Sequence, residues 1–517
     1  MAFSFFGCKW LMPDKDAPGN VTGLIATIGN GRIILSWTNP AEEDFAGVRI
    51  VFSVDAAPAS IDAGTQIYEG KDSTFIHTGL TNGTTYFYTA FAYDESGNFA
   101  SGVSVSATPA ELLWARTIDM YGGHDYLYGV TIDSQDNVVA AGYYDPDPDT
   151  TDEGSTCYLV KLDSLGNQLW DDSIEIGPVG GSKQTSDERL YDVGVDAQDN
   201  IYVAGQISGT FISYTMGSYH TGFLVRKYDA DGTLQWEDIW QESGNSPWQK
   251  ALCLDFDSSG NLYVGGNAFG AWGTILGEWA IRKYSSAGTS LWEPSLYYDA
   301  VQGIVDLNEA CRNIVIDDEN NIIGCGHVGV SYPDSSSYDY NWHVRKYSPD
   351  TTLLWSYTYA GTQNLNDQAF SVDTDSAGDV FVAGYVNNGI SNSGGESDYD
   401  WLVMKFSKDG SAGDGVVLWT YQYETEPGSS EGCYALLVDD DDNVLVAGST
   451  IDSVEERTLR IVKLSNEDGS EIDEFIYPVE YGVAPWSIYL RGNKIALAGT
   501  IGNGNDNDLL VMCLELP

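Results

Sequence analysis

The residues of this chain that could carry out chemistry are few and scattered, apart from its acids. It has five histidines and seven cysteines, and no His-Glu-x-x-His or paired Cys-x-x-Cys pattern gives them metal-binding spacing. No Gly-x-Ser-x-Gly elbow or phosphate loop occurs. Cys325 and His327 share one strand face and His343 begins the next strand, so the three could approach each other at one edge of the sheet that these strands form. The sequence predicts no catalytic residue and leaves metal binding unknown.

Acids dominate the charged residues, with 76 Asp and Glu against 24 Lys and Arg and a formal net charge of −52. A surface this acidic repels DNA, RNA and anionic membranes, so the sequence excludes a nucleic-acid partner. The recurrent Asp-rich turns lack the twelve-residue spacing of an EF-hand and are interpreted as hairpin turns. Acidic loops such as 145–154 suit Ca²⁺ better, and Ca²⁺ is the one cofactor for which the sequence leaves room.

The elements that must position these residues are β-strands. Hydrophobic residues make up 43% of the chain and aromatic residues 13%, which is enough apolar surface for packed cores. Short alternating apolar runs bounded by turn residues are frequent, whereas helix-period stretches with caps are hard to find. The sequence therefore predicts an all-β fold. No run approaches 18 apolar residues, so no transmembrane segment is predicted.

From residue 111 onward the chain repeats a unit of about 60 residues. One signature is an Asp-x-x-[Asp/Gly/Asn]-[Asn/Asp] turn followed by an apolar run and a closing glycine. A second is an alternating strand, such as the one that begins at Tyr158. Each signature occurs seven times, and the last turn is degenerate. The closing glycines are Gly142, Gly205, Gly266, Gly326, Gly384, Gly448 and Gly499.

A third signature, Leu-Trp or its equivalent after a polar turn, is missing from the last repeat but occurs at the other end of the region, around Trp114. The strand at 111–118 can therefore complete the last unit and close a seven-bladed β-propeller over residues 110–517. The repeats resemble the bacterial propeller repeat family abbreviated SBBP. This resemblance implies an exported or cell-surface protein without a known common activity.

Residues 17–109 are predicted to form a separate small β-sandwich, because short alternating strands are split there by turn residues. Trp37 lies on an early strand, and Tyr86 follows Leu80 by six residues. These positions resemble the buried tryptophan and the tyrosine corner of a fibronectin type III domain. No Arg-Gly-Asp tripeptide is present, so the resemblance implies a spacer or docking module and not an integrin ligand.

Residues 1–16 are expected to be an N-terminal segment outside both domains. Cys8 follows the apolar stretch MAFSFFG, which resembles the end of a bacterial lipoprotein signal. The basic region and the longer apolar stretch of a complete secretory signal are absent. Cys8 is therefore either a lipidation site behind a truncated signal or an ordinary cysteine.

Strand parity predicts which face of the propeller varies. Within each repeat the turns after the first and third strands are short, whereas the other two connections are long, and these two classes emerge at opposite ends of an antiparallel meander. The long loops therefore share one face, where binding specificity is usually carried. The aromatic residues predicted to line this binding face are Tyr143, Tyr144, Tyr338, Tyr340 and Tyr399.

The sequence favours a non-catalytic binding or structural protein, extracellular or on the cell surface and, through Cys8, lipid-anchored if that signal is real. Its partner would be a protein or polysaccharide at the cell surface, or further copies of itself in an assembly. The alternative is an extracellular carbohydrate-active enzyme with its site on the long-loop face. Acid pairs are too numerous for a glycosidase dyad to be chosen, because separation in space decides that chemistry.

Overall fold

The structure is a computed structural model whose described part contains strands and no α-helix. The chain divides into two compact units, the first made mainly of the residues up to Glu111 and the second mainly of the residues from Leu112 onward. No helix in the described part is long and apolar enough to cross a membrane. The described residues are 16–29, 31–120, 123–145, 154–174, 188–209, 220–240, 249–269, 277–292, 296–297, 309–331, 338–361, 365–390, 397–411, 413–423, 431–451, 457–478, 482–502 and 507–515.

The first unit is a β-sandwich of seven strands. Trp37 is buried in its core, and the Tyr86 hydroxyl accepts a hydrogen bond of 2.9 Å from the backbone N–H of Thr81. One sheet pairs β1 (Thr22–Gly29), β2 (Arg32–Thr38) and β5 (Thr74–Thr78) in that order, and the other pairs β4 (Thr65–Gly70), β3 (Phe45–Ser53), β6 (Tyr86–Asp94) and β7 (Val103–Ala107).

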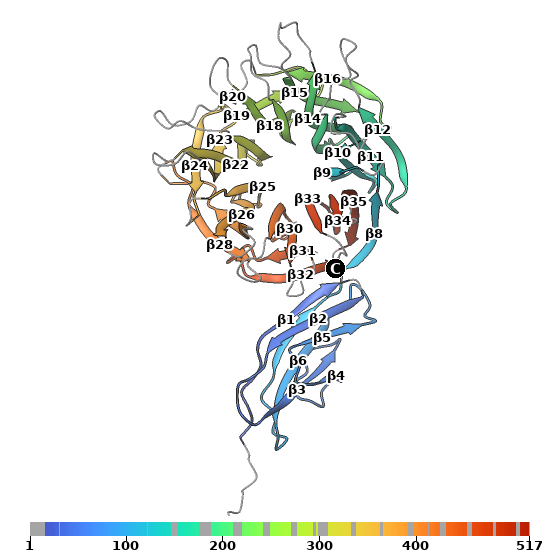
Figure 1. Ribbon diagram of the computed structural model, residues 1–517, viewed down its shortest axis with the longest axis vertical. Coiled ribbons are helices and arrows are strands. Elements are labelled where there is room, and N and C mark those ends of the chain that lie inside the picture. Colours follow the sequence, from blue (N-terminus) through green and yellow to red (C-terminus); the bar gives the residue numbers. More distant parts are fainter. Residues whose placement is uncertain are drawn as a thin grey trace, which may run out of the picture. The chain divides into compact units, whose positions relative to one another are not determined.

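The second unit has β-propeller architecture: its described strands form groups of four, here called blades 1 to 7, which stand around a central axis (Figure 1). Blade 1 holds β9 (Tyr126–Ile132), β10 (Val138–Tyr144), β11 (Thr156–Leu162) and β12 (Gln168–Ile174). Blade 2 holds β13 (Arg189–Val195), β14 (Ile201–Gly209), β15 (His220–Tyr228) and β16 (Leu234–Trp240). Blade 3 holds β17 (Lys250–Phe256), β18 (Leu262–Phe269), β19 (Gly277–Tyr284) and β20 (Leu296–Tyr297).

Blades 4 to 6 continue the same order from the axis outward. Blade 4 holds β21 (Ala310–Ile316), β22 (Ile322–Ser331), β23 (Tyr338–Tyr347) and β24 (Leu353–Tyr359). Blade 5 holds β25 (Gln368–Thr374), β26 (Val380–Ile390), β27 (Ser397–Phe406) and β28 (Val417–Tyr423). Blade 6 holds β29 (Gly432–Val438), β30 (Val444–Ile451), β31 (Arg457–Leu464) and β32 (Glu471–Pro478).

Blade 7 combines both ends of the second unit. It holds β33 (Val483–Arg491), β34 (Lys494–Gly502) and β35 (Asn507–Glu515), with β8 (Glu111–Ile118) as its outermost strand. Trp114 of β8 packs against the core cluster that blade 7 shares with blade 1.

Burial follows the position of each strand in its blade. Every residue of β10 and β11 is buried, because the second and third strands lie between neighbouring blades, and their sequences are accordingly apolar over most of their length. The outermost strand β12 exposes alternate residues and buries little. Two-sided burial therefore explains why the second and third strands of each repeat are apolar.

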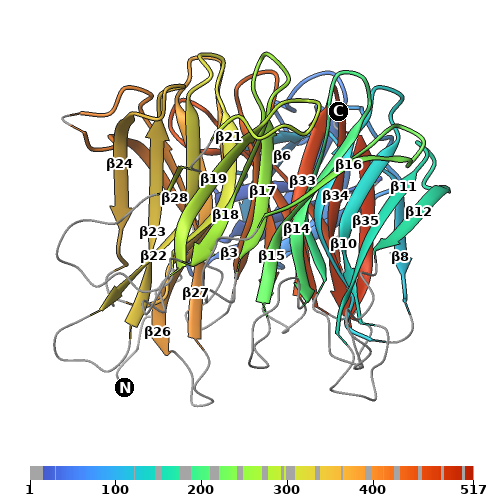
Figure 2. The same cartoon turned by 90° about the horizontal axis from the view of Figure 1, so that it is seen from above.

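The short turns inside the blades are Asx turns, as the sequence predicts. In the turn after β9, Asp133 Oδ1 accepts backbone hydrogen bonds from Gln135 at 2.8 Å and Asn137 at 2.9 Å, and Asp136 has a positive φ of 62°. Figure 2 shows these described turns on one side of the ring. Asp oxygens in these turns thus satisfy backbone N–H groups.

The outer tryptophans join neighbouring blades. Trp114 Nε1 donates to the Ser164 carbonyl at 3.1 Å, and its ring covers Gly166, whose φ of 80° and close contact with the indole leave no room for a side chain. The equivalent bonds join Trp236 to Ser286 at 3.2 Å, Trp355 to Lys408 at 3.0 Å and Trp419 to Asn466 at 2.8 Å.

Candidate functional site

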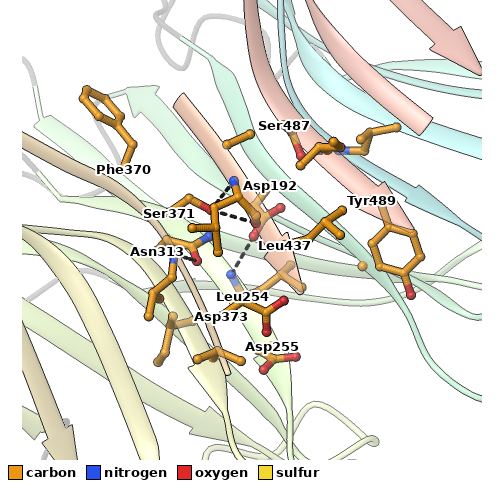
Figure 3. Close-up of a pocket in the computed structure, with 18 of the residues that line it drawn as sticks. Asp192, Leu254, Asp255, Asn313, Phe370, Ser371, Asp373, Leu437, Ser487 and Tyr489 are labelled. Atoms are coloured by element: carbon orange, nitrogen blue, oxygen red, sulfur yellow. Dashed lines mark hydrogen bonds between the residues drawn. The ribbon is translucent and has the colours of Figure 1, made fainter. Parts of the chain in front are cut away.

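A cavity of about 660 Å³ lies along the axis of the ring. All seven innermost strands, β9, β13, β17, β21, β25, β29 and β33, contribute to its wall. Figure 3 shows that polar side chains from several blades approach each other around it. A pocket of this size, with aromatic walls and a few polar groups, is the usual form of a small-ligand site.

Each innermost strand carries a β-bulge at the same position. The register against the second strand skips one residue there, and in every blade the skipped residue lines the cavity. A bulge inserts one unpaired residue and turns its side chain away from the normal alternation, which is why bulges recur beside functional sites. The seven bulge residues, here called the collar, are Tyr128, Tyr191, Leu252, Arg312, Phe370, Tyr434 and Trp486.

The collar is a nearly continuous arc of rings. Tyr128 lies 5.5 Å from Tyr191 and 5.3 Å from Trp486, measured between ring centroids. Tyr434 continues the arc, with centroids 4.4 Å from Trp486 and 5.4 Å from Phe370. Such pairs provide rigid apolar faces with polar edges.

Arg312 ends the aromatic arc and adds a positive charge to the collar. Its guanidinium carbon lies 5.5 Å from the centroid of Phe370, and Nη2 donates to Gln368 Oε1 at 3.3 Å. Leu252, in the blade before it, is the aliphatic member of the collar. The wall is therefore asymmetric, with aromatic rings on most blades and a cation on blade 4.

Below the collar, toward the short turns, three carboxylates line the cavity. Asp192 Oδ2 accepts a hydrogen bond of 2.8 Å from Leu254 N, in the innermost strand of the next blade. Asp255 accepts from Ile316 N at 2.6 Å, and Asp373 from Val438 N at 2.8 Å. These carboxylates fasten one innermost strand to the next.

Burial within the ring raises the pKa of each of these three carboxyl groups. The pKa rises to about 7 for Asp192 and Asp255 and to about 6 for Asp373, because desolvation outweighs the backbone hydrogen bonds that favour the charged form. The carboxylates of Asp373 and Asp192 also raise the pKa of Asp255 by repulsion. The floor of the cavity therefore changes charge near neutral pH.

Neutral side chains of the innermost strands also join neighbouring blades. The oxygens of Asn313 and Ser487 accept from backbone N–H groups of the following blade at 3.1 and 3.2 Å. Ser371 both accepts from Leu436 N at 3.0 Å and donates to Leu436 O at 3.1 Å. The polar groups below the collar are thus engaged in holding the ring together.

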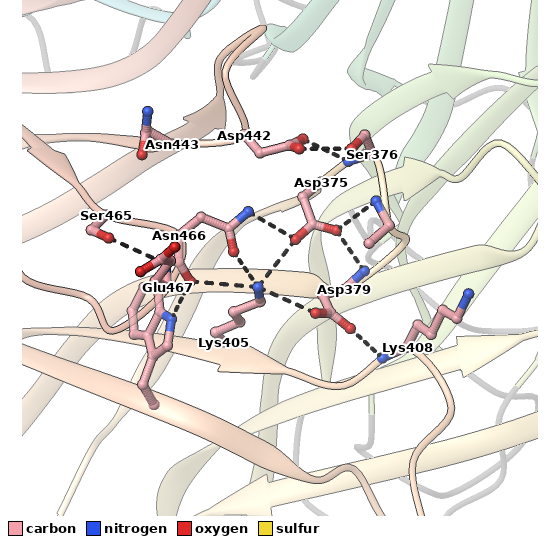
Figure 4. A network of polar contacts seen from close by, with 12 residues as sticks. Asp375, Ser376, Asp379, Lys405, Lys408, Asp442, Asn443, Ser465, Asn466 and Glu467 are labelled. Atoms are coloured by element: carbon pink, nitrogen blue, oxygen red, sulfur yellow. Dashed lines mark hydrogen bonds and ion pairs between the residues drawn. The ribbon is translucent and has the colours of Figure 1, made fainter.

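A second polar network lies at the short-turn end of the blades (Figure 4). Lys405 Nζ is 3.2 Å from both Asp375 Oδ2 and Asp379 Oδ2, and it also contacts Asn466 of the next blade. The equivalent pairs are Lys161 with Asp133, Lys227 with Asp196, Lys283 with Asp257, Lys346 with Asp317 and Lys463 with Asp439. The repetition of this pair in six blades marks it as part of the scaffold.

The tyrosines predicted to line the binding face occupy different layers. Tyr143 is buried at the end of β10 and lies 5.9 Å from Tyr128, so it backs the collar. Tyr399 lies 4.7 Å from Tyr385, which lines the cavity. Both tyrosines thus contact residues of the cavity wall, and their role in binding stays a prediction.

Two other predicted tyrosines have contacts elsewhere in the described part of the chain. Tyr144 is packed in the core between blades 7 and 1, and Tyr340 contacts the ring of His327 at 4.6 Å. The side chain of Tyr338 and the whole of Cys8 lie outside the described residues, as do most of the long loops.

The predicted approach of Cys325, His327 and His343 is wrong. In the β22–β23 pair, Cys325 and His327 face the same side as their partners Val344 and Trp342, whereas His343 pairs with Gly326 and points to the opposite side of the sheet. The described residues contain no group of three His, Cys, Asp or Glu side chains that could hold a metal ion.

The collar itself was missed by the sequence reasoning, although a signal exists. Every collar residue precedes the first turn position by five residues, as Tyr128 precedes Asp133 and Trp486 precedes Arg491. That position varies from repeat to repeat, which hides it from a search for repeated residues. A bulge cannot be read from the pattern, since one inserted residue changes the side that a side chain faces.

Comparisons with known proteins show distant similarity. No protein-family profile matches the chain. It is 23% identical over 302 residues to an uncharacterized WD repeat-containing protein of Acanthamoeba polyphaga mimivirus, covering 51% of this chain but only 20% of that protein. The chain thus spans about a fifth of that relative's length.

Solved structures match the chain at lower identity. A protein of unknown function from Dyadobacter fermentans shares 12% identity over 79% of this chain and 99% of its own, with a TM-score of 0.46. The polysaccharide lyase Uly1 shares 10% identity over 75% of this chain and 90% of its own, with a TM-score of 0.42. A Hadza microbial sialidase shares 10% over 95% of both chains, with a TM-score of 0.39.

Proposed function

We propose that the chain is a fibronectin type III module followed by a seven-bladed propeller of the SBBP type, which β8 closes. The strand orders β1-β2-β5 and β4-β3-β6-β7, buried Trp37 and the Tyr86–Thr81 hydrogen bond support the module. The place of β8 beside β35 supports the closure, because radial closure removes the exposed edges of a terminal blade.

The propeller functions as a non-catalytic glycan-binding protein, and its site is the collar and the cavity below it. The observation that supports this function is the bulge in all seven innermost strands, which turns one side chain per blade into the same cavity. Ring faces with polar edges suit the alternating apolar and hydroxylated surfaces of a saccharide.

A binding role is favoured over catalysis by what the cavity carboxylates do. Both oxygens of Asp192 accept backbone hydrogen bonds, from Val193 and Leu254, each at 2.8 Å. Both oxygens of Asp373 are engaged in the same way. Acids committed to backbone donors are poorly placed to act as nucleophile or proton donor toward a glycosidic bond.

The site of action in this proposal is the cell exterior. A strongly acidic surface repels nucleic acid and anionic membrane surfaces, whereas an uncharged polysaccharide is not repelled. The fibronectin type III module would hold the propeller away from its attachment point, and lipidation at Cys8 is one form such an attachment could take.

A screen of cell-surface polysaccharides for both retention and product release tests this function. We expect retention without release of new chain ends, and a loss of at least about tenfold in affinity for Trp486→Ala, since buried aromatic anchors dominate binding. The matched control is Leu169→Ala, an exposed apolar residue on the outermost strand of blade 1. Product release would establish the enzymatic alternative, and equal binding by both variants would remove the collar as the site.

A further inference from the structure

We propose that the glycan bound by the collar carries a carboxylate and that Arg312 pairs with it. This inference rests on the proposed function and names the chemical class of its ligand: a saccharide with a single uronic acid at or near one end. The residue that points to it is the one cation among the seven collar positions.

Arg312 has no carboxylate partner in the described part of the chain. Its printed hydrogen bond is to the neutral amide oxygen of Gln368 at 3.3 Å, and its Nε is buried without a partner. By contrast, Arg226 pairs with Glu237 at 2.5 Å, and the third-strand lysines of six blades pair with turn aspartates. Because acids outnumber bases 76 to 24, a cation left without an acid is notable.

The position of Arg312 directs its free donors into the cavity. The bulge between Cys311 and Asn313 turns the side chain toward the axis, and the guanidinium lies over the ring of Phe370. Its charge acts on Tyr128 and Tyr385, which also line the cavity, and opposes the rise in their pKa that burial causes. A guanidinium at this place presents a planar fork that matches a carboxylate.

The surrounding charges limit the ligand to one acidic group. Asp192, Asp255 and Asp373 line the deeper cavity and would repel a second carboxylate there. The net charge of −52 would also repel a polyanion, although salt screens this repulsion beyond about 8–10 Å. An otherwise neutral oligosaccharide avoids both costs.

A sugar is favoured over an acidic peptide because the collar offers a series of aromatic rings in contact beside the cation. Phe370, Tyr434 and Trp486 form an unbroken series on the side of Arg312 that faces blades 5 to 7. A pyranose ring can lie on these faces while its carboxylate reaches the guanidinium. A flexible acidic peptide would gain the ion pair but would have to order its backbone to use the same surface.

The experiment compares matched ligands by calorimetric titration of the full-length protein. The probes are a neutral trisaccharide with one terminal glucuronic acid, the same trisaccharide with that carboxyl reduced to give glucose, and a short peptide with one glutamate. We expect the acidic sugar to bind at least about tenfold more tightly than the reduced one, which is the scale of a charge-assisted pair.

Variants assign this preference to Arg312. Arg312→Gln should abolish the preference while keeping affinity for the reduced sugar within about twofold, and Arg312→Lys should retain part of it because it keeps the charge but loses the fork. The control is Lys408→Gln, which removes an exposed cation at the opposite end of the blades. Melting curves show whether each variant is folded. If Arg312→Gln does not fold, the comparison of the acidic and reduced sugars on the wild-type protein still tests whether a carboxylate is recognised.

Each remaining outcome overturns the inference. Equal affinity for the acidic and reduced sugars refutes the carboxylate while leaving glycan binding intact. A preference that persists in folded Arg312→Gln places the recognition elsewhere, and tighter binding of the peptide makes the ligand a protein. If neither sugar binds, the proposed function fails together with this inference.

Discussion

The two ends of the innermost strands differ in how often the same residue type recurs in the seven repeats. At the short-turn end, an aspartate recurs in six blades and pairs with a third-strand lysine. Five residues earlier in the same strands, the collar position holds Tyr, Tyr, Leu, Arg, Phe, Tyr and Trp in chain order. Positions that repeat hold the blades together, whereas the position that varies faces the cavity and is free to shape a binding site.

Blade 7 shows what happens where the scaffold pattern is interrupted. Cys513 occupies the place of the third-strand lysine and Arg491 that of the turn aspartate, so this blade lacks the usual pair. Instead, Lys494 on its second strand contacts Asp136 of blade 1 at 2.5 Å. The charge pairing at this junction is preserved with different residues, whereas the bulge at Trp486 is kept in place.

Deleting residues 111–118 should give the largest effect on the scaffold. It removes β8, exposes the edge of β35 and empties the site that Trp114 fills beside blade 1, at a cost of several kcal/mol, about 4 or more. We expect a lower melting temperature and aggregation in size-exclusion chromatography. Deleting residues 1–15 serves as the control. An unchanged cooperative melt would refute closure of the ring by β8.

Lys405→Met should lower the stability of the protein without changing its glycan affinity. It leaves the carboxylates of Asp375 and Asp379 without their cation at a buried position, which typically costs about 3–5 kcal/mol. Glycan affinity of the folded protein should change little. Lys408→Met, an exposed lysine three residues away, is the matched control for thermal and urea unfolding. Equal stability of both variants would show that the repeated pair contributes nothing.

The acids that line the cavity and the acids of the short turns should change stability with pH in opposite directions. Asp192, Asp255 and Asp373 have raised pKa values, so the folded state binds more protons and stability falls as pH rises from about 4 to 7. Asp133 and Asp257 have lowered pKa values, so their contribution is lost as pH falls below about 4.

The melting temperature should therefore peak near pH 4 and be lower at pH 8 than at pH 5. Asp192→Asn should weaken the decline between pH 5 and 8, because the amide cannot become charged in the cavity. Asp231→Asn, at an exposed turn position, controls for the general loss of negative charge. A decline that is identical in both variants would assign it to overall repulsion, not to the cavity.

Leu252→Tyr should have the smallest effect. It changes the collar and leaves the pairs at the short-turn end as they are. It adds a ring at the aliphatic collar position, so we expect about two- to threefold tighter binding of the retained glycan and an unchanged melting temperature. Leu169→Tyr on the outer surface is the control in the same titration. Weaker binding would mean that the ligand needs the open space beside Leu252.

Much of the fold was predictable because it depends on local and periodic features. Turn chemistry at Asp133, two-sided burial of strands such as β10 and the Leu-Trp recurrence each act over a few residues and repeat along the chain. These features predicted the all-β class, the repeat period and the hairpin turns. The candidate site was predictable only as far as the long-loop end of the ring.

The sequence by itself determined the repeats, the turns and the apolar strands, because each is specified by neighbours along the chain. Only the tertiary structure decided which side chains meet. A bulge adds one residue to a strand and turns Arg312 into the cavity, whereas regular pairing sends His343 and Cys325 to opposite sides of one sheet. Whether a side chain faces the axis or the next blade depends on this single-residue register, which is set by contacts between strands and not by residue type.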